Sequence, residues 1–257
     1  METLALKLVL TPALIGISTL VGRRWGQAVG GWLVGLPLTS GPIVLFLALE
    51  HGTAFGADAA QGALRGLVAE ASFALCYSRV ARQNAWPSAF FAGTLGFAVA
   101  GFAIQSLAPQ PALLVAMVIG ALVLTLRLLP RFTGVTAPVR PQAWDLPARM
   151  VTATLLVLAL TSAAGWLGPQ LSGLISTFPL LAGVLTVFAH HAQGKTAAIN
   201  VLRGLLLGLF SFAAFFVALG ATIEPLGIAT AFLVALAAAL AVQTVSLLAA
   251  RHTVRRP

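Results

Sequence analysis

The chain carries the stretch GWLVGLPLTSG at residues 31–41, and a related stretch, GLISTFPLLAG, follows at residues 173–183. Glycine, proline and glycine stand at the same places in both stretches, at an offset of 142 residues. Gly52 and Gly194 keep the same offset further along the chain. These matches predict that the chain contains two related copies of one structural unit.

Other matches extend the two copies. Leu64-Arg65-Gly66 recurs as Leu202-Arg203-Gly204 at an offset of 138, a shortening that indicates a tighter loop in the second copy. Lys7 has Arg149 as its counterpart. The similarity covers the first three segments of each copy, whereas the last segment matches only in length and hydrophobicity.

The composition indicates a membrane protein. Hydrophobic residues make up 59% of the chain and charged residues only 8%, against about 25% charged residues in soluble domains. The mean hydropathy is +0.99, and apolar runs of roughly 20 residues, each long enough to cross a bilayer, recur throughout. We therefore expect an all-α polytopic membrane protein whose partner is the lipid bilayer, and we attribute the net charge of +9 to cytoplasmic loops rather than to nucleic-acid binding.

The apolar runs predict nine transmembrane helices. They lie near residues 4–21, 28–49, 58–78, 86–107, 111–129, 147–167, 170–190, 197–219 and 225–248. Residues 1–107 form the first four-helix repeat, residues 108–146 a linking helix and cytoplasmic loop, and residues 147–257 the second repeat. Because five crossings separate the two starts, the repeats should be inverted relative to each other, as in many transporters.

The distribution of basic residues supports this count. They cluster after every odd-numbered span, at Arg23 and Arg24, Arg79 and Arg82, Arg127, Arg131 and Arg140, Lys195, and Arg251, Arg255 and Arg256. The positive-inside rule places these loops in the cytoplasm. We expect a multi-pass protein of the bacterial inner (cytoplasmic) membrane, with the N-terminus outside and the C-terminus in the cytoplasm.

Each copy has a proline inside its second span, Pro37 in the first and Pro179 in the second. Proline removes a backbone donor and clashes with the preceding turn, so the second span should break in mid-membrane and the seventh should bend less. A half-helix that starts there would direct its positive end at an anion. The alternative is a structural kink, with the freed backbone groups bonded by the hydroxyls of Thr39, Ser40, Ser176 and Thr177.

Arg65 and Arg203 are a matched pair of arginines, each about two turns into its span. A charge at this depth is usually paired or faces a cavity, and the guanidinium suits carboxylate or phosphate. The alternative is that each long side chain reaches back to the interface, which we favour for Lys7 and Arg149 because they lie nearer to span ends. The pair predicts a substrate site for an anion.

Glu70 is the only acidic residue in the interior of a predicted span, since Asp58 stands at the first residue of the same span. It follows Arg65 by five residues, about 140° around the helix, so the two should not pair directly. An isolated carboxylate there must find a cation, with Lys7, Arg149 and Arg203 as candidates, or take up a proton. Proton coupling and a structural ion pair are equally compatible with this position, and Gly208 stands at the matched position in the second copy.

Other chemistry has few candidate residues. His190 and His191 point in different directions on a helix and have no cysteine or carboxylate nearby, which favours an interfacial role over metal binding. Cys76 lies in an apolar helix and is interpreted as a packing residue. We find no metal cluster, nucleotide loop or nucleophile motif, and we expect no cofactor, metal or catalytic residue.

The stretch GGWLVGLPL at residues 30–38, followed by Glu50-His51-Gly52 and Arg65-Gly66, resembles the GlpM-like small bacterial membrane proteins. These are similar to a single copy of the four-span unit, so the resemblance implies a tandem inverted duplication. It implies no substrate and no catalytic residues. The order of four, one and four spans also looks like that of fused fluoride channels, as an architectural analogy.

These observations predict a transporter or channel, not an enzyme, with a site for a small anionic substrate or an anionic lipid head group where the repeats meet. A second hypothesis is a non-transporting membrane component that assists cell-envelope assembly. A third is an intramembrane enzyme acting on lipid, against which the scarcity of nucleophiles, acids and bases argues. The sequence leaves homo-oligomerisation open.

Overall fold

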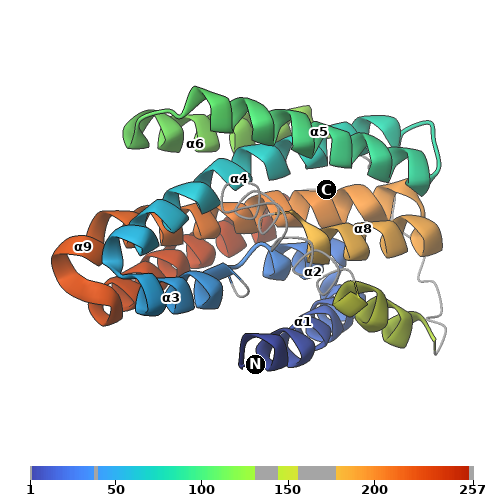
Figure 1. Ribbon diagram of the computed structural model, residues 1–257. Coiled ribbons are helices and arrows are strands. Elements are labelled where there is room, and N and C mark those ends of the chain that lie inside the picture. The colour runs from blue at the N-terminus through green and yellow to red at the C-terminus, as the bar shows by residue number, and fades with distance from the viewer. Residues whose placement is uncertain (1, 38–39, 131–143, 156–177, 255–257) are drawn as a thin grey trace.

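The computed structural model describes residues 2–37, 40–130, 144–155 and 178–254. For residues 2–8, 10–11, 42–43, 46–47, 50–51 and 246–254 it describes the backbone alone. Every regular element in these ranges is a helix (Figure 1). The labelled helices are α1 (Glu2–Trp25), α2 (Gln27–Val34), α3 (Ser40–His51), α4 (Thr53–Val80), α5 (Trp86–Leu107), α6 (Pro111–Leu128), α8 (Leu180–Gln193) and α9 (Lys195–Val254), and residues 145–155 are also helical.

Among the residues that the structure describes, three helices are long and apolar enough to cross a membrane: α5, α6 and the part of α9 over Lys195–Val245. Large apolar side chains stay exposed on them, among them Phe91 at 71%, Phe102 at 73% and Leu233 at 68%. Such exposure would be costly in water but is favourable against lipid. The described part of the chain is therefore all-helical, and three of its helices have the length and apolarity of membrane spans, as the composition predicts.

The packing places α4 and α9 at the centre of the bundle. α5 and α6 pack on α4, while α2 and α8 pack on α9, and α1 lies outside α2 (Figure 1). The buried side chains of α4 and α9 form most of the apolar core. These two central helices carry Arg65, Glu70 and Arg203.

The expected break in the second span is present. Residues 35–37 leave the helix between α2 and α3, and the amide of Gly41 donates to the carbonyl oxygen of Pro37 at 2.9 Å. In the second copy, Phe178 and Pro179 are non-helical before α8, and the amide of Gly183 donates to the carbonyl of Pro179 at 2.6 Å. Residues 170–177 of the seventh span lie outside the described residues, so the break or bend expected there stays a prediction, and "second break" below names only Phe178 and Pro179.

The junctions that follow the broken spans also match. The amide of Gly52 donates to the carbonyl of Ala48, and that of Gly194 to the carbonyl of His190, both at 2.9 Å and at the offset of 142. Gly52 has φ 93° and Gly194 has φ 83°, a region that side chains with a Cβ atom rarely adopt. One glycine therefore turns the chain from α3 into α4 and from α8 into α9.

These junctions correct the expectation of a tighter loop in the second copy. Helix α4 begins at Thr53, directly after Gly52, and α9 begins at Lys195, directly after Gly194. Arg65 then lies four residues deeper in its helix than Arg203, which is about one helical turn. The offset shortens because α4 has an extra turn, and the expected difference in loop length is wrong.

Helix α9 contains both of the spans expected over residues 197–219 and 225–248. Its 60 residues are interrupted at Gly227, which has φ 74° and ψ 169°, two residues after Pro225. The chain doubles back there, at the left of Figure 1. The two spans are thus present as helices on either side of one glycine.

Glycines let α2 and α9 approach until their backbones touch. A Cβ atom on Gly35 would lie 2.7 Å from the Cα atom of Gly208. A Cβ atom on Gly31 would meet the carbonyl of Val201, and one on Gly204 would meet the carbonyl of Ala28. Gly31 and Gly35, the residue that caps α2, thus face Gly204 and Gly208 of α9, and two glycines four residues apart on each side permit this close contact.

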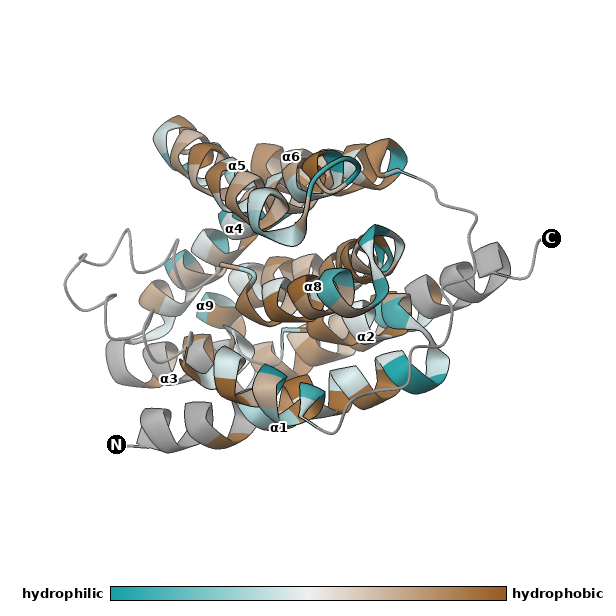
Figure 2. Cartoon of the chain, turned by 90° about the vertical axis from the view of Figure 1, so that its right-hand side faces the viewer, coloured by the Kyte–Doolittle hydropathy of each residue, from teal (hydrophilic) through white to brown (hydrophobic). Residues whose placement is uncertain are grey.

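Several loops with basic residues meet at one end of the bundle, which faces the viewer in Figure 2. The contacts there are Lys195 Nζ to the carbonyl of Arg82 at 2.9 Å, Gln27 to Gln193 at 3.3 Å, and Arg23 to Asp145 at 2.6 Å. They join the end of α4 to the start of α9, the start of α2 to the end of α8, and the end of α1 to the start of helix 145–155. This grouping agrees with the clustering of basic loops that the sequence predicts.

Candidate functional site at the second helix break

The second break lies in a cluster of aromatic rings. Phe178 contacts Phe73 of α4 at a centroid distance of 6.1 Å, and Phe90 and Phe97 of α5 at 6.4 and 5.1 Å. The interplanar angles of 80° to 85° make all three contacts edge-to-face, the geometry that aromatic pairs prefer. These rings anchor the residue before Pro179 against α4 and α5.

Glu70 lies one turn from this cluster, because it precedes Phe73 by three residues on the same face of α4. Its side chain is 9% exposed, and its Oε2 atom is buried without a hydrogen-bond partner. No ion pair joins Glu70 to another described residue. A carboxyl oxygen is therefore buried beside the second break with its bonding capacity unused.

The ion-pair partners expected for Glu70 have other contacts. Arg149 pairs with Asp145, and Arg203 donates to the carbonyl of Pro130 at 3.4 Å. The side chain of Lys7 lies outside the described residues. The proposed pairing of Glu70 with Arg149 is therefore wrong.

The side chain of Arg149 is buried and paired, a contact that sequence reasoning did not anticipate, while its expected place at the membrane interface stays a prediction. Its side chain is 3% exposed, its Nε atom lies 3.1 Å from the Asp145 carboxylate, and its guanidinium lies 5.0 Å from the ring centre of Phe188. Asp145 also accepts a bond from Arg23 at 2.6 Å. Sequence reasoning assigned Asp145 to a loop, although its spacing of four residues from Arg149 is that of a helical ion pair.

Arg65 is half-buried, and only part of its hydrogen-bonding capacity is used. Its Nη1 atom donates to Gln105 Oε1 at 3.4 Å, a long contact, while its Nε–H is buried without a hydrogen-bond partner. It makes no ion pair with Glu70, as their helical spacing predicts. Arg65 and Arg203 bond different groups, one on α5 and one after α6.

The other candidate residues that the structure describes lie next to the two breaks. Pro37 and Ser40 are half-buried beside the first break, and Pro179 is buried at the N-cap position of α8. Thr39, Ser176 and Thr177 lie outside the described residues. Their part in bonding freed backbone groups stays a prediction.

The matched positions of the two copies carry different groups. Gly208 of α9 touches Gly35 at the first break, whereas its counterpart on α4 is Glu70. The first break is closed by backbone contact, while the corresponding position near the second break carries a buried carboxyl group. The candidate site is therefore asymmetric.

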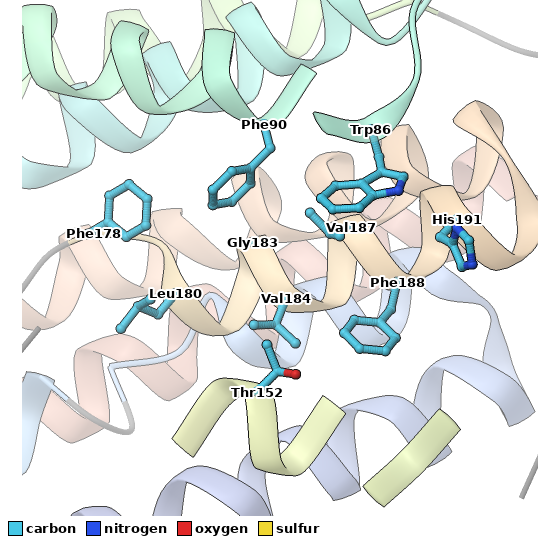
Figure 3. Close-up of a pocket in the computed structure, with 10 residues that line it drawn as sticks. All are labelled: Trp86, Phe90, Thr152, Phe178, Leu180, Gly183, Val184, Val187, Phe188 and His191. Carbon is cyan, nitrogen blue, oxygen red and sulfur yellow. The ribbon is translucent and has the colours of Figure 1, made fainter. Parts of the chain in front are cut away.

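An apolar cavity of about 320 Å³ runs along α8 from the second break. Phe178, Leu180, Val184 and Phe188 line it from one side, with Trp86 and Phe90 of α5 opposite and Thr152 of helix 145–155 below (Figure 3). Gly183, Val187 and His191 complete the lining. Sequence reasoning missed this cavity, because its walls come from three distant segments.

His190 and Cys76 each contact a neighbouring helix. His190 Nδ1 lies 3.0 Å from the hydroxyl of Tyr77. The Sγ atom of Cys76 would lie 2.6 Å from a Cβ atom on Gly96, so it fills a close helix contact. Within the described ranges, no group of three potential metal ligands comes together.

Comparison with protein-family models, curated proteins and solved structures gives no match to this chain. The resemblance to GlpM-like proteins therefore stays a prediction. Function must be argued from the helix breaks and from the buried polar groups beside them.

Proposed function

We propose that this protein is an integral membrane transporter or channel for a small anionic substrate or an anionic lipid head group. Its site lies where two inverted four-helix repeats, joined by a linking helix, meet. In this proposal the nine helices cross the bacterial inner membrane with the N-terminus outside and the C-terminus in the cytoplasm. The repeats are those of a duplicated GlpM-like unit.

The paired breaks support the inverted duplication. Pro37 and Pro179 each accept a hydrogen bond from the glycine four residues later, and the helix that follows each proline ends at a glycine of positive φ. A repeated sequence pattern has thus produced a repeated backbone pattern. Broken helices in matching positions of two halves are typical of transporter binding sites.

The unpartnered Nε–H of Arg65 is the observation that carries the proposal. A buried charged donor that lacks a partner is costly. An anion at this position would accept from the guanidinium and recover that cost, because the planar fork of donors fits carboxylate or phosphate. Arg203 is the matched donor on α9, where the anion would enter or leave from the other side.

In this proposal, Glu70 couples the transport of the anion to the binding and release of a proton. Its carboxyl group is buried on the same helix as Arg65, and its Oε2 atom is unpartnered. Binding and release of a proton there would change the charge of the site by one unit. Such a change alters how strongly an anion is held nearby.

One observation favours the alternative, a non-transporting component that assists cell-envelope assembly. The glycine contact between α2 and α9 leaves no space at the first break. A protein with no path through either break would not transport. Measurement of flux decides between the two functions.

The test is uptake of labelled carboxylates and phosphates into vesicles that contain the purified protein. We expect Arg65→Ala and Arg203→Ala to lower uptake about tenfold or more, since each removes a charge-assisted hydrogen bond. Arg127→Ala, an exposed cation at the end of α6, is the control and should leave uptake unchanged. Equal flux in all three variants would exclude the site, and no uptake of any anion by the wild-type protein would favour the alternative.

A further inference from the structure

The cavity along α8 has the depth of one membrane leaflet. Its lining runs from Leu180 to His191, which lie eleven positions apart on the helix, or roughly 16 Å along the axis. The hydrocarbon core of a bilayer is about 30 Å thick, so half of it is about 15 Å. Apart from Thr152 and His191, the lining side chains are apolar. The cavity therefore offers an apolar environment whose length matches the distance from the middle of a bilayer to one surface.

Two cations flank the end of the cavity at that surface. Lys195 follows His191 by four residues, and Arg82 precedes Trp86 by four. Lys195 Nζ donates to the carbonyl of Arg82 at 2.9 Å, which brings the two sides of the mouth together. Both side chains are exposed. The carboxylate at the start of helix 145–155, Asp145, is already paired with Arg23 and Arg149.

We propose that this cavity binds one acyl chain of an anionic phospholipid from the surrounding bilayer, with the phosphate of the head group held by Lys195 and Arg82. Apolar walls one leaflet deep match the chain, and the two cations at the mouth match the charge of the head group. Tryptophan at the mouth suits the head-group region, where its ring is favoured. This binding does not require transport and is independent of the function proposed above.

The experiment uses the full-length protein purified in a neutral detergent. The probe is phosphatidylglycerol that carries a photoactivatable diazirine in one acyl chain, and mass spectrometry locates the cross-links. We expect labelling to concentrate on the peptides that contain Trp86, Phe90 and residues 180–191. Unlabelled phosphatidylglycerol should compete, while phosphatidylcholine should compete about fivefold less well for each cation that contributes, given the usual strength of a cation near an anionic head group.

Variants test the cavity and the charges separately. Val187→Trp fills the cavity and should abolish labelling of these peptides, whereas Phe91→Trp places the same bulk on the exposed face of α5 and should not. Lys195→Ala combined with Arg82→Ala should remove the preference for the anionic lipid. Arg127→Ala at the end of α6 should preserve it. Thermal unfolding of each variant checks that it is folded.

Labelling spread evenly over lipid-exposed faces, and unchanged in a folded Val187→Trp protein, would overturn the proposal. Equal competition by the two lipids in the wild-type protein would also overturn it, because the charged mouth would then have no role. The readout is cross-linking rather than flux. A failure here therefore leaves the transport proposal standing, and a failure of transport leaves this one standing.

Discussion

At the first break, α2 lies so close to α9 that glycines on both helices touch through their backbones. At the second break, α8 is held by side chains instead. Phe178 packs into three rings from α4 and α5, and Phe188 lies under the guanidinium of Arg149. The two breaks carry the same proline and glycine pattern, yet their packing uses different chemistry.

This difference in packing indicates which of the two breaks can change its conformation while the rest of the fold stays in place. Backbone contacts between glycines can loosen only if whole helices separate, because no side chain lies between them to rotate. Aromatic rings and a buried ion pair can rearrange while the helices stay in place. We therefore expect the second break, with Glu70 beside it, to be the place where a ligand or a proton acts.

The largest effect should come from the first break. Gly204→Leu would place a side chain on the carbonyl of Ala28 and force α2 away from α9. We expect a loss of more than about 4 kcal/mol in unfolding free energy, or failure to fold, because the clash is with backbone. Gly62→Ala is the control, since a Cβ atom there meets nothing within 4 Å and a helical glycine gains up to about 1 kcal/mol on this change. Denaturant titration in detergent measures both, and equal stability of the two variants would contradict the close contact.

A smaller effect is expected from the ion pair between Arg149 and Asp145, which lies against Phe188 of α8. Asp145→Asn removes the charge that balances Arg149, whose side chain is 3% exposed. We expect a loss of about 3 kcal/mol, because a buried charge is left without its counter-ion. Arg23→Ala removes the more exposed partner of the same carboxylate and should cost about 1 kcal/mol or less. A similar loss in both variants would mean that the buried pair with Arg149 contributes no more than the exposed pair with Arg23.

The ring cluster gives a third test. Phe178→Ala removes three edge-to-face contacts from a half-buried side chain, and we expect a loss of about 2 kcal/mol. Leu36→Ala changes the matched residue of the first break, which is also half-buried, and should cost about 1 kcal/mol. Thermal unfolding in one detergent compares the pair. If Leu36→Ala proved the more damaging, the description of the second break as held by side chains would be wrong.

Sequence reasoning found the elements that depend on local pattern. The helical membrane class, the break at Pro37 and the bounds of α5 follow from apolar run length and from proline, which act within a few residues. It could not find the partner of Arg149, because Asp145 precedes residue 147, where the sixth span was expected to start, and was assigned to the loop before it. The aromatic cluster and the cavity were also missed, since Phe73, Phe90 and Phe178 meet only after three helices pack.

The smallest effect on stability should come from Glu70→Gln, which tests what the second break does rather than how it is held. The amide has nearly the same shape, and Glu70 has no ion pair among the described residues, so we expect unfolding free energy to change by less than about 1 kcal/mol. An amide cannot release a proton, so anion uptake into vesicles should lose its dependence on a pH gradient. Gly208→Ala alters the matched position of the first break and should lower the amount of folded protein instead. Uptake that followed the pH gradient equally well in wild-type and Glu70→Gln protein would remove proton coupling from Glu70 and leave its buried carboxyl group without a functional role.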